Sequence, residues 1–244
     1  MKRIQWHLVA LLVSMTTLLI SGCGGGGGGG PAPVTPPPPA LPVAVNASAA
    51  WANLFAATRT FNVSGVGVDG ASYTASVTIT PGTSTGNGGP MDTITTTALV
   101  NKNGALLGNG GSTLFATPGT LVPQIYTDTS GYCAFFSNAT APTTTNAVMG
   151  QSGALFNATM SPYTASTNNC DTTTLTGLAI NEIWSIYGDV STGVAYFCVD
   201  STNSGTSSTT ESDCVQVDVA GNLGTKARVT IGNGASTIVT MTGG

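Results

Sequence analysis

Apolar and polar residues alternate with a period of two over several segments of this chain, and this pattern constrains the fold more than any other feature. In residues 73–80 (YTASVTIT), Tyr73 and the apolar residues at every second position after it face one side, and serine and threonine face the other. Residues 92–100, 214–219 and 226–231 alternate in the same way. Successive side chains of a β-strand point to opposite faces of the sheet, so the pattern predicts half-buried strands, as in antiparallel sheets.

Turn signals separate the alternating segments. They are the pairs Asn103-Gly104, Ser130-Gly131, Ser152-Gly153, Thr192-Gly193, Gly221-Asn222 and Asn233-Gly234. Their spacing predicts about eight to ten strands. We therefore predict an all-β fold, a single antiparallel meander domain that is closed as a barrel or folded as a sandwich, with one short N-terminal helix.

Residues 46–58 (NASAAWANLFAAT) predict that helix. Asn46 or Ser48 is suited to cap its N-terminus, and Trp51 and Leu54 fall on one face. Because the segment contains no basic residue, we expect it to plug a barrel end or to cover a sheet edge rather than to bind a membrane.

Residues 65–70 (GVGVDG) match the spacing G-x-G-x-x-G of dinucleotide-binding proteins. That fingerprint requires a helix after the glycines, whereas the residues that follow alternate like a strand. We therefore predict a hairpin with a three-residue loop at 69–71. In this register Phe61 pairs with Ile79, and Val63 pairs with Val77.

Charged residues make up only 7 % of the chain, and after Arg3 there are four basic and ten acidic residues. Without a basic patch, we expect no nucleic-acid partner. The one histidine is His7, so His-assisted catalytic triads and His-ligated metals are not expected in the body of the chain. We predict no cofactor and no metal centre.

The N-terminus combines the basic residues Lys2 and Arg3, an apolar run over residues 8–20 and the sequence LISGC, which ends at Cys23. The apolar run has the length of a signal-peptide core and is short for a membrane span. The segment resembles the lipobox of bacterial lipoproteins. The resemblance implies that a signal peptide of residues 1–22 is removed, that acyl chains on Cys23 anchor the protein, and that the protein lies at the outer membrane.

Seven glycines and a proline-rich run follow Cys23. We predict that residues 23–45 form a lipidated tether, partly flexible and partly polyproline, and that residues 46–244 form a disulfide-bonded β domain. The first expected partner is the membrane, which the acyl chains on Cys23 would contact. An envelope protein, a glycan or a small apolar ligand are the alternative partners of the domain.

Four cysteines remain after Cys23, and an even number in an exported domain predicts disulfides. If the alternating apolar residues of their segments point inward, Cys198 and Cys214 both point outward and share one face of the sheet. We therefore predict the disulfide Cys198–Cys214 and, from the remaining pair, Cys133–Cys170. Zinc ligation is the alternative role of these cysteines, but the sequence has no C-x-x-C motif that would favour it.

Residues 200–211 match an EF-hand calcium loop at Asp200, Gly205 and Glu211. The flanking segments have the pattern of strands rather than helices, however. A loop closed by the Cys198–Cys214 disulfide is therefore the preferred interpretation.

Glu182 is the candidate catalytic acid. It shares strand phase with Trp184, and a carboxyl beside an indole is expected to have a raised pKa, which suits a general acid in glycoside hydrolysis. Asp189 is the second acid that the segment offers, but it lies at the strand end, distant from Glu182. Because Ile183 and Tyr187 occupy the opposite phase, the sequence leaves open which face is inside. The preferred interpretation of Glu182 is a carboxylate at a sheet edge, with no catalytic site.

The expected function is that of a membrane-anchored envelope lipoprotein with a non-enzymatic, β-rich binding or surface-interaction domain. One alternative is a structural envelope component, and another is a carboxylate-based glycan hydrolase that uses Glu182. A ligand-sized apolar interior would favour small-ligand binding, whereas a cleft with Glu182 and a second acid would favour the hydrolase.

Overall fold

The computed structural model describes residues 40–42, 44–86, 89–136, 138–164, 169–170, 178–204 and 209–244. These residues form one helix, α1 (Ala47–Leu54), and fourteen strands, more than the number predicted. The strands are β1 (Arg59–Val66), β2 (Ser72–Gly86), β3 (Gly89–Lys102), β4 (Ala105–Ala116), β5 (Pro123–Asp128), β6 (Tyr132–Phe135), β7 (Ser152–Thr159), β8 (Ser161–Thr164), β9 (Asn169–Cys170), β10 (Ala179–Asp189), β11 (Val194–Ser204), β12 (Thr209–Val217), β13 (Leu223–Asn233) and β14 (Ser236–Gly243). The predicted all-β class and the single short helix are confirmed.

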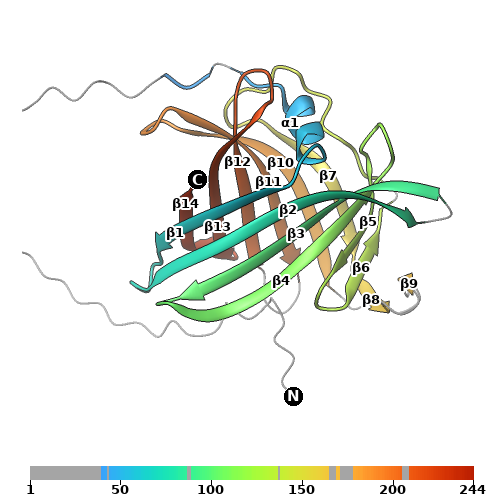
Figure 1. Ribbon diagram of the computed structural model, residues 1–244, viewed down its shortest axis with the longest axis horizontal. Coiled ribbons are helices and arrows are strands. Elements are labelled where there is room, and N and C mark those ends of the chain that lie inside the picture. Colours follow the sequence, from blue (N-terminus) through green and yellow to red (C-terminus); the bar gives the residue numbers. More distant parts are fainter. Residues whose placement is uncertain are drawn as a thin grey trace, which may run out of the picture.

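The strands form one antiparallel sheet in the order β7-β10-β11-β12-β13-β14-β1-β2-β3-β4-β5-β6-β8-β9. Two meanders, β1 to β6 and β10 to β14, therefore lie side by side, and β14 joins them by pairing with β1. Figure 1 shows that this sheet is strongly curled, with α1 at its upper end. The predicted meander is confirmed, whereas the hydrogen-bonded ladder of the described strands is not closed into a ring.

One continuous chain segment, residues 152–164, links the two edges of the curled sheet. Its first part, β7, pairs with β10 at one edge, and its second part, β8, pairs with β6 at the other edge. Only Met160 separates β7 from β8. Phe136, which follows β6, stacks on Phe156 of β7 with ring centroids 3.8 Å apart. The sheet therefore encloses an interior although its ladder is open.

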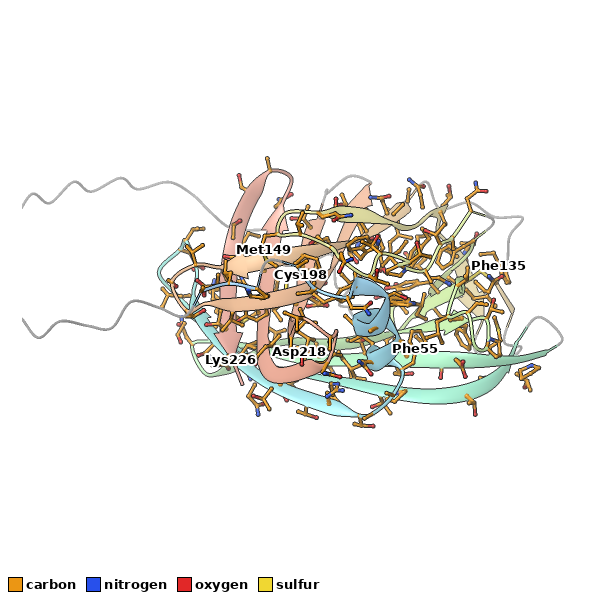
Figure 2. All side chains as sticks on the ribbon, turned by 90° about the horizontal axis from the view of Figure 1, so that it is seen from above. Phe55, Phe135, Met149, Cys198, Asp218 and Lys226 are labelled. Atoms are coloured by element: carbon orange, nitrogen blue, oxygen red, sulfur yellow. A yellow bond between two sulfur atoms is a disulfide. The ribbon has the colours of Figure 1, made fainter. Side chains whose placement is uncertain are left out.

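The alternation in the sequence matches the two faces of the sheet. Apolar residues of the period-two segments, such as Val77 and Val229, are buried on the inner face. Large side chains with almost no exposed surface, including Ile186, Phe197 and Met241, join them in one core cluster. Figure 2 shows side chains gathered between the facing walls of the sheet. This burial is the main stabilising contribution to the fold.

Helix α1 covers one end of the interior. Trp51 and Leu54 are buried on its inward face, and the Trp51 indole N–H donates to the carbonyl of Leu121 (3.0 Å) in the loop between β4 and β5. The Asn53 amide donates to the carbonyl of Gly221 (2.9 Å) in the loop between β12 and β13. The prediction that this helix plugs an end of the sheet agrees with these contacts.

Asn46 is the N-cap of α1, because its Oδ1 accepts a hydrogen bond from the backbone N–H of Ala49 (2.9 Å). We expect Asn46→Ala to lower the free energy of unfolding by about 1 kcal/mol, since the substitution leaves a helix donor without its acceptor. Urea denaturation monitored by circular dichroism measures this loss. Ser48→Ala, two residues further on, is the matched control and should change stability by less than about 0.5 kcal/mol. Equal losses in both variants would show that Asn46 contributes nothing as a cap.

The GVGVDG segment forms the predicted hairpin between β1 and β2, but in a different register. Phe61 pairs with Val77 rather than with Ile79, and Val63 pairs with Ala75 rather than with Val77. The difference is two residues, so every side chain keeps its predicted face.

A longer loop causes this difference in register. The loop spans residues 67–71, where Asp69 Oδ1 accepts a hydrogen bond from the N–H of Ala71 (3.0 Å), and Gly70 has a left-handed φ of 75°. The Asp69 carboxylate also forms an ion pair with Lys102 (2.7 Å) at the next hairpin. This ion pair, with the hydrogen bonds from Ala71 and Tyr73, lowers the pKa of Asp69 to about 2.

The predicted turn at Ser152-Gly153 is wrong, because both residues lie within β7. Gly153 faces the indole of Trp184 so closely that a Cβ at this position would lie 2.6 Å from Nε1. The glycine is therefore needed for the close approach of a neighbouring strand rather than for a turn.

Both predicted disulfides are present. Cys198 and Cys214 are directly paired across β11 and β12 on the outer face. Cys133 of β6 is bonded to Cys170 of β9, at the edge that residues 152–164 help to join.

Candidate functional site

The curled sheet encloses a cavity of about 290 Å³. Towards the end covered by α1, its wall is apolar and includes Trp51, Leu54, Phe61, Ile79 and Phe197. Farther from the helix, acidic and hydroxyl side chains of β5, β10, β11 and β12 take over the lining. The cavity therefore has an apolar end and a polar, acidic end.

The acidic end is built on three neighbouring strands. Glu182 of β10 pairs with Ser201 of β11, which in turn pairs with Glu211 of β12, so the three residues form one row across the sheet. Because adjacent strands lie about 4.8 Å apart, the backbones of Glu182 and Glu211 are about 10 Å apart. Asp213, two residues along β12, faces the same interior and pairs with Val199.

The Glu182 carboxyl is almost completely buried, with 8 % of the residue exposed, and the Ser201 hydroxyl donates to its Oε1 (3.0 Å). The pKa of Glu182 is raised to about 7, mainly by burial; the hydrogen bond from Ser201 opposes this rise, and the charge of Asp213 adds to it. Glu182 is therefore poised between its neutral and charged forms near neutral pH.

Burial also raises the pKa of Glu211 and of Asp213. The charge of Glu182 adds to the rise at Glu211, and the charges of Glu211 and Asp200 add to the rise at Asp213. No donor among the described residues forms a hydrogen bond with the carboxylate of Glu211 or Asp213. The three carboxyls thus oppose one another's ionisation inside one cavity.

Tyr126 of β5 lines the same cavity. Its pKa is raised, first by burial and then by the charges of Glu182 and Asp128, while a hydrogen bond with Ser112 lowers it slightly. The phenol therefore stays protonated and offers an uncharged O–H and an aromatic ring to the acidic end.

Basic residues do not neutralise this acidic end. The four basic residues that follow residue 39 are Arg59, Lys102, Lys226 and Arg228, all of them described, and none lines the cavity. Lys102 is paired with Asp69, and the Arg228 guanidinium lies over the ring of Tyr187, 4.3 Å from its centroid.

The residues that the sequence singled out do not all lie in the same site. Glu182 shares a face with Trp184, as strand phase indicated, and the structure shows that this face is the inner one, which the sequence left open. Asp189 does not join it, because Asp189 ends β10 and its Oδ1 accepts hydrogen bonds from the N–H (2.9 Å) and hydroxyl (2.6 Å) of Ser191, which lower its pKa. The second and third acids of the site are Glu211 and Asp213 instead.

The EF-hand interpretation of residues 200–211 conflicts with the register of the hairpin. Ser201, not Asp200, pairs with Glu211, so Asp200 and Glu211 lie on opposite faces of the sheet. Asp200 accepts a hydrogen bond from the Ser185 hydroxyl (2.5 Å) on the outer face, whereas Glu211 lines the cavity. Gly205 lies outside the described residues, as does Cys23.

Comparisons of the chain with protein-family models, with curated proteins and with solved structures find no match. Among the described residues, no helix is long and apolar enough to cross a membrane. The interpretation of the site therefore depends on its own geometry.

Proposed function

We propose that this protein is an envelope lipoprotein that binds a small apolar or amphipathic molecule inside its curled sheet. The cavity of about 290 Å³, apolar at the helix end and polar at the other, is the observation that supports this function. Its volume is close to the lower limit of ligand pockets, roughly 300 Å³, and such pockets are typically apolar with a few polar groups. A core that served stability alone would be packed without such a space.

Gly108 allows a direct test of binding in the cavity. It lines the cavity, and a Cβ at this position would meet no atom within 4 Å. N-phenyl-1-naphthylamine, a neutral fluorophore, is expected to bind the purified protein saturably with increased emission. Gly108→Trp should weaken this binding at least about tenfold, because the indole would occupy ligand space.

Gly89→Trp is the matched control, since a Cβ at Gly89 also meets no atom within 4 Å but the residue does not line the cavity. It should bind the fluorophore like the unmodified protein. Absence of saturable binding, or equal losses in the two tryptophan variants, would contradict the proposed function and favour a structural role in the envelope.

The proposed anchor is Cys23. Its place at the end of a signal-peptide-like segment supports acylation, and the glycine and proline run that follows suits a tether between a membrane and the β domain. Cys23→Ser should move the protein from the outer-membrane fraction to the soluble fraction of a bacterial cell. Mass spectrometry of the unmodified protein should find acyl chains on Cys23, and an unmodified Cys23 would contradict the anchor.

Glycan hydrolysis is a second candidate function, because Glu182, with its pKa near 7, shares a cavity with Glu211 and Asp213. This arrangement supplies a protonated acid and additional carboxylates, the two components that glycosidases require. Fluorogenic glycosides test it: hydrolysis that Glu182→Gln abolishes would favour the enzyme over the binding protein.

A further inference from the structure

We propose that the ligand of this cavity is a cationic amphiphile, with an apolar body beside helix α1 and an amine or quaternary ammonium head among Glu182, Glu211 and Asp213. This inference rests on the proposed binding function and adds the charge of the ligand to it.

The first argument is the lack of a counter-charge. Four acidic residues line the cavity. Asp128 accepts hydrogen bonds from the backbone N–H groups of Ser130 and Tyr132, whereas Glu182, Glu211 and Asp213 face the interior with only the Ser201 hydroxyl, on Glu182, as a hydrogen-bond donor among the described residues. All four basic residues that follow residue 39 lie outside the lining. A buried carboxylate without a partner is costly, so each of these groups must either keep its proton or meet a positive charge. A cationic head would supply the charge that the chain itself does not place there.

The second argument is the shape of the charge distribution. Glu182, Glu211 and Asp213 lie on β10 and β12, the two strands that flank β11, whereas the end near α1 is lined by apolar residues such as Trp51, Leu54 and Phe61. A molecule that is charged at one end and apolar at the other matches this distribution, whereas a uniformly polar sugar would leave the apolar wall without contacts.

The third argument is the neutral aromatic ring at the acidic end. Tyr126 lines the cavity and keeps its proton next to the carboxyls. An aromatic face beside carboxylates is a favourable environment for an ammonium group, because the ring quadrupole attracts the cation. An anionic head would instead meet only acidic and neutral groups.

Three amphiphiles with the same dodecyl chain test the inference: dodecyltrimethylammonium, 1-dodecanol and dodecyl sulfate. Each is used below its micelle concentration to displace N-phenyl-1-naphthylamine from the purified protein at pH 7.5. Dodecyltrimethylammonium should displace the fluorophore at a concentration at least about tenfold lower than dodecanol, and dodecyl sulfate should be the weakest.

The variant Glu182→Gln/Asp213→Asn should remove most of this preference while it still binds the neutral fluorophore. Both changes preserve side-chain shape and remove charge that is costly to bury, so the fold should be retained. Asp200→Asn, on the outer face of β11, is the control and should keep the preference. Fluorophore binding without a preference for the cation would overturn this inference and leave the proposed function standing, whereas no fluorophore binding would overturn the proposed function.

Proton release provides a second readout. A cation among the carboxyls favours their charged forms, so binding of dodecyltrimethylammonium near pH 6 should release protons, and the affinity should rise with pH through about 7. The groups that take part are Glu182, Glu211 and Asp213, with Tyr126 and Asp128 of β5 facing the same cavity and Asp200 acting on Asp213 from the outer face. Calorimetry in two buffers of different ionisation enthalpy measures the release, and pH-independent binding without it would overturn the inference.

Discussion

Replacing Cys133 and Cys170 with alanine is expected to lower the free energy of unfolding by about 4 kcal/mol. The disulfide closes a loop with a sequence separation of 37 residues, and the loss of that cross-link increases the conformational freedom of the unfolded chain. In a domain of this size the melting temperature should fall by roughly 10 °C, as circular dichroism would measure. The double variant is used so that no unpaired thiol remains.

The Cys198–Cys214 disulfide provides the comparison. It spans a sequence separation of only 16 residues and joins strands that already pair over their length, so its removal should cost less, about 3 kcal/mol. A larger loss for Cys198→Ala/Cys214→Ala than for Cys133→Ala/Cys170→Ala would show that loop length does not decide the contribution of these bonds.

Substitution of Glu182 by glutamine is expected to make the ligand-free protein more stable above neutral pH. The pKa of Glu182 is raised from 4.5 to about 7 in the folded state, so the folded protein holds this proton more tightly than the unfolded chain. The contribution of this tighter proton binding to the free energy of unfolding is complete below pH 4.5 and is lost as the pH rises to about 7. This shift corresponds to about 3 kcal/mol, which Glu182→Gln should restore at pH 8.5.

Urea denaturation at pH 5 and pH 8.5 measures this difference. At pH 5 the variant and the unmodified protein should differ by less than about 1 kcal/mol, because Glu182 is then mostly protonated and glutamine occupies a similar volume. Asp189→Asn is the control, since the lowered pKa of Asp189 predicts the opposite sign, a loss of stability above its ordinary pKa of 3.8. Equal effects of Glu182→Gln at both pH values would contradict the burial of an ionising carboxyl.

The two faces of the sheet could be predicted from the sequence because the side-chain period of a strand is local information. This period correctly placed Val77 and Val229 inside and Cys198 and Cys214 outside. The number of strands was underestimated because short strands such as β6 and β8 are too brief to show an alternation.

The register of the first hairpin could not be predicted from local residues alone. Its five-residue loop depends on Asp69, whose ion pair with Lys102 comes from the following hairpin. The curl of the sheet also depends on distant pairings, such as those of β7 with β10 and of β8 with β6. Local propensity carries no information about such partners.

The acidic site was found in part. Strand phase singled out Glu182, but Glu211 and Asp213 were missed as cavity residues, although they share the phase of Val215 and Val217 in the same strand. Extending the alternation of residues 214–219 towards the N-terminus would have placed both acids inside. The meeting of β10 and β12 around one cavity follows only from the order of strands in the sheet.

The pairing of β1 with β14 has a consequence for the order in which the protein folds. Val63 pairs with Gly243, so the seam between the two meanders joins residues that are far apart in the sequence. Contacts with such a large sequence separation form slowly, because loop closure precedes the gain from pairing. Each meander can form from strands that follow one another in the chain, whereas their seam needs both meanders to be present, so we expect the seam to form after them.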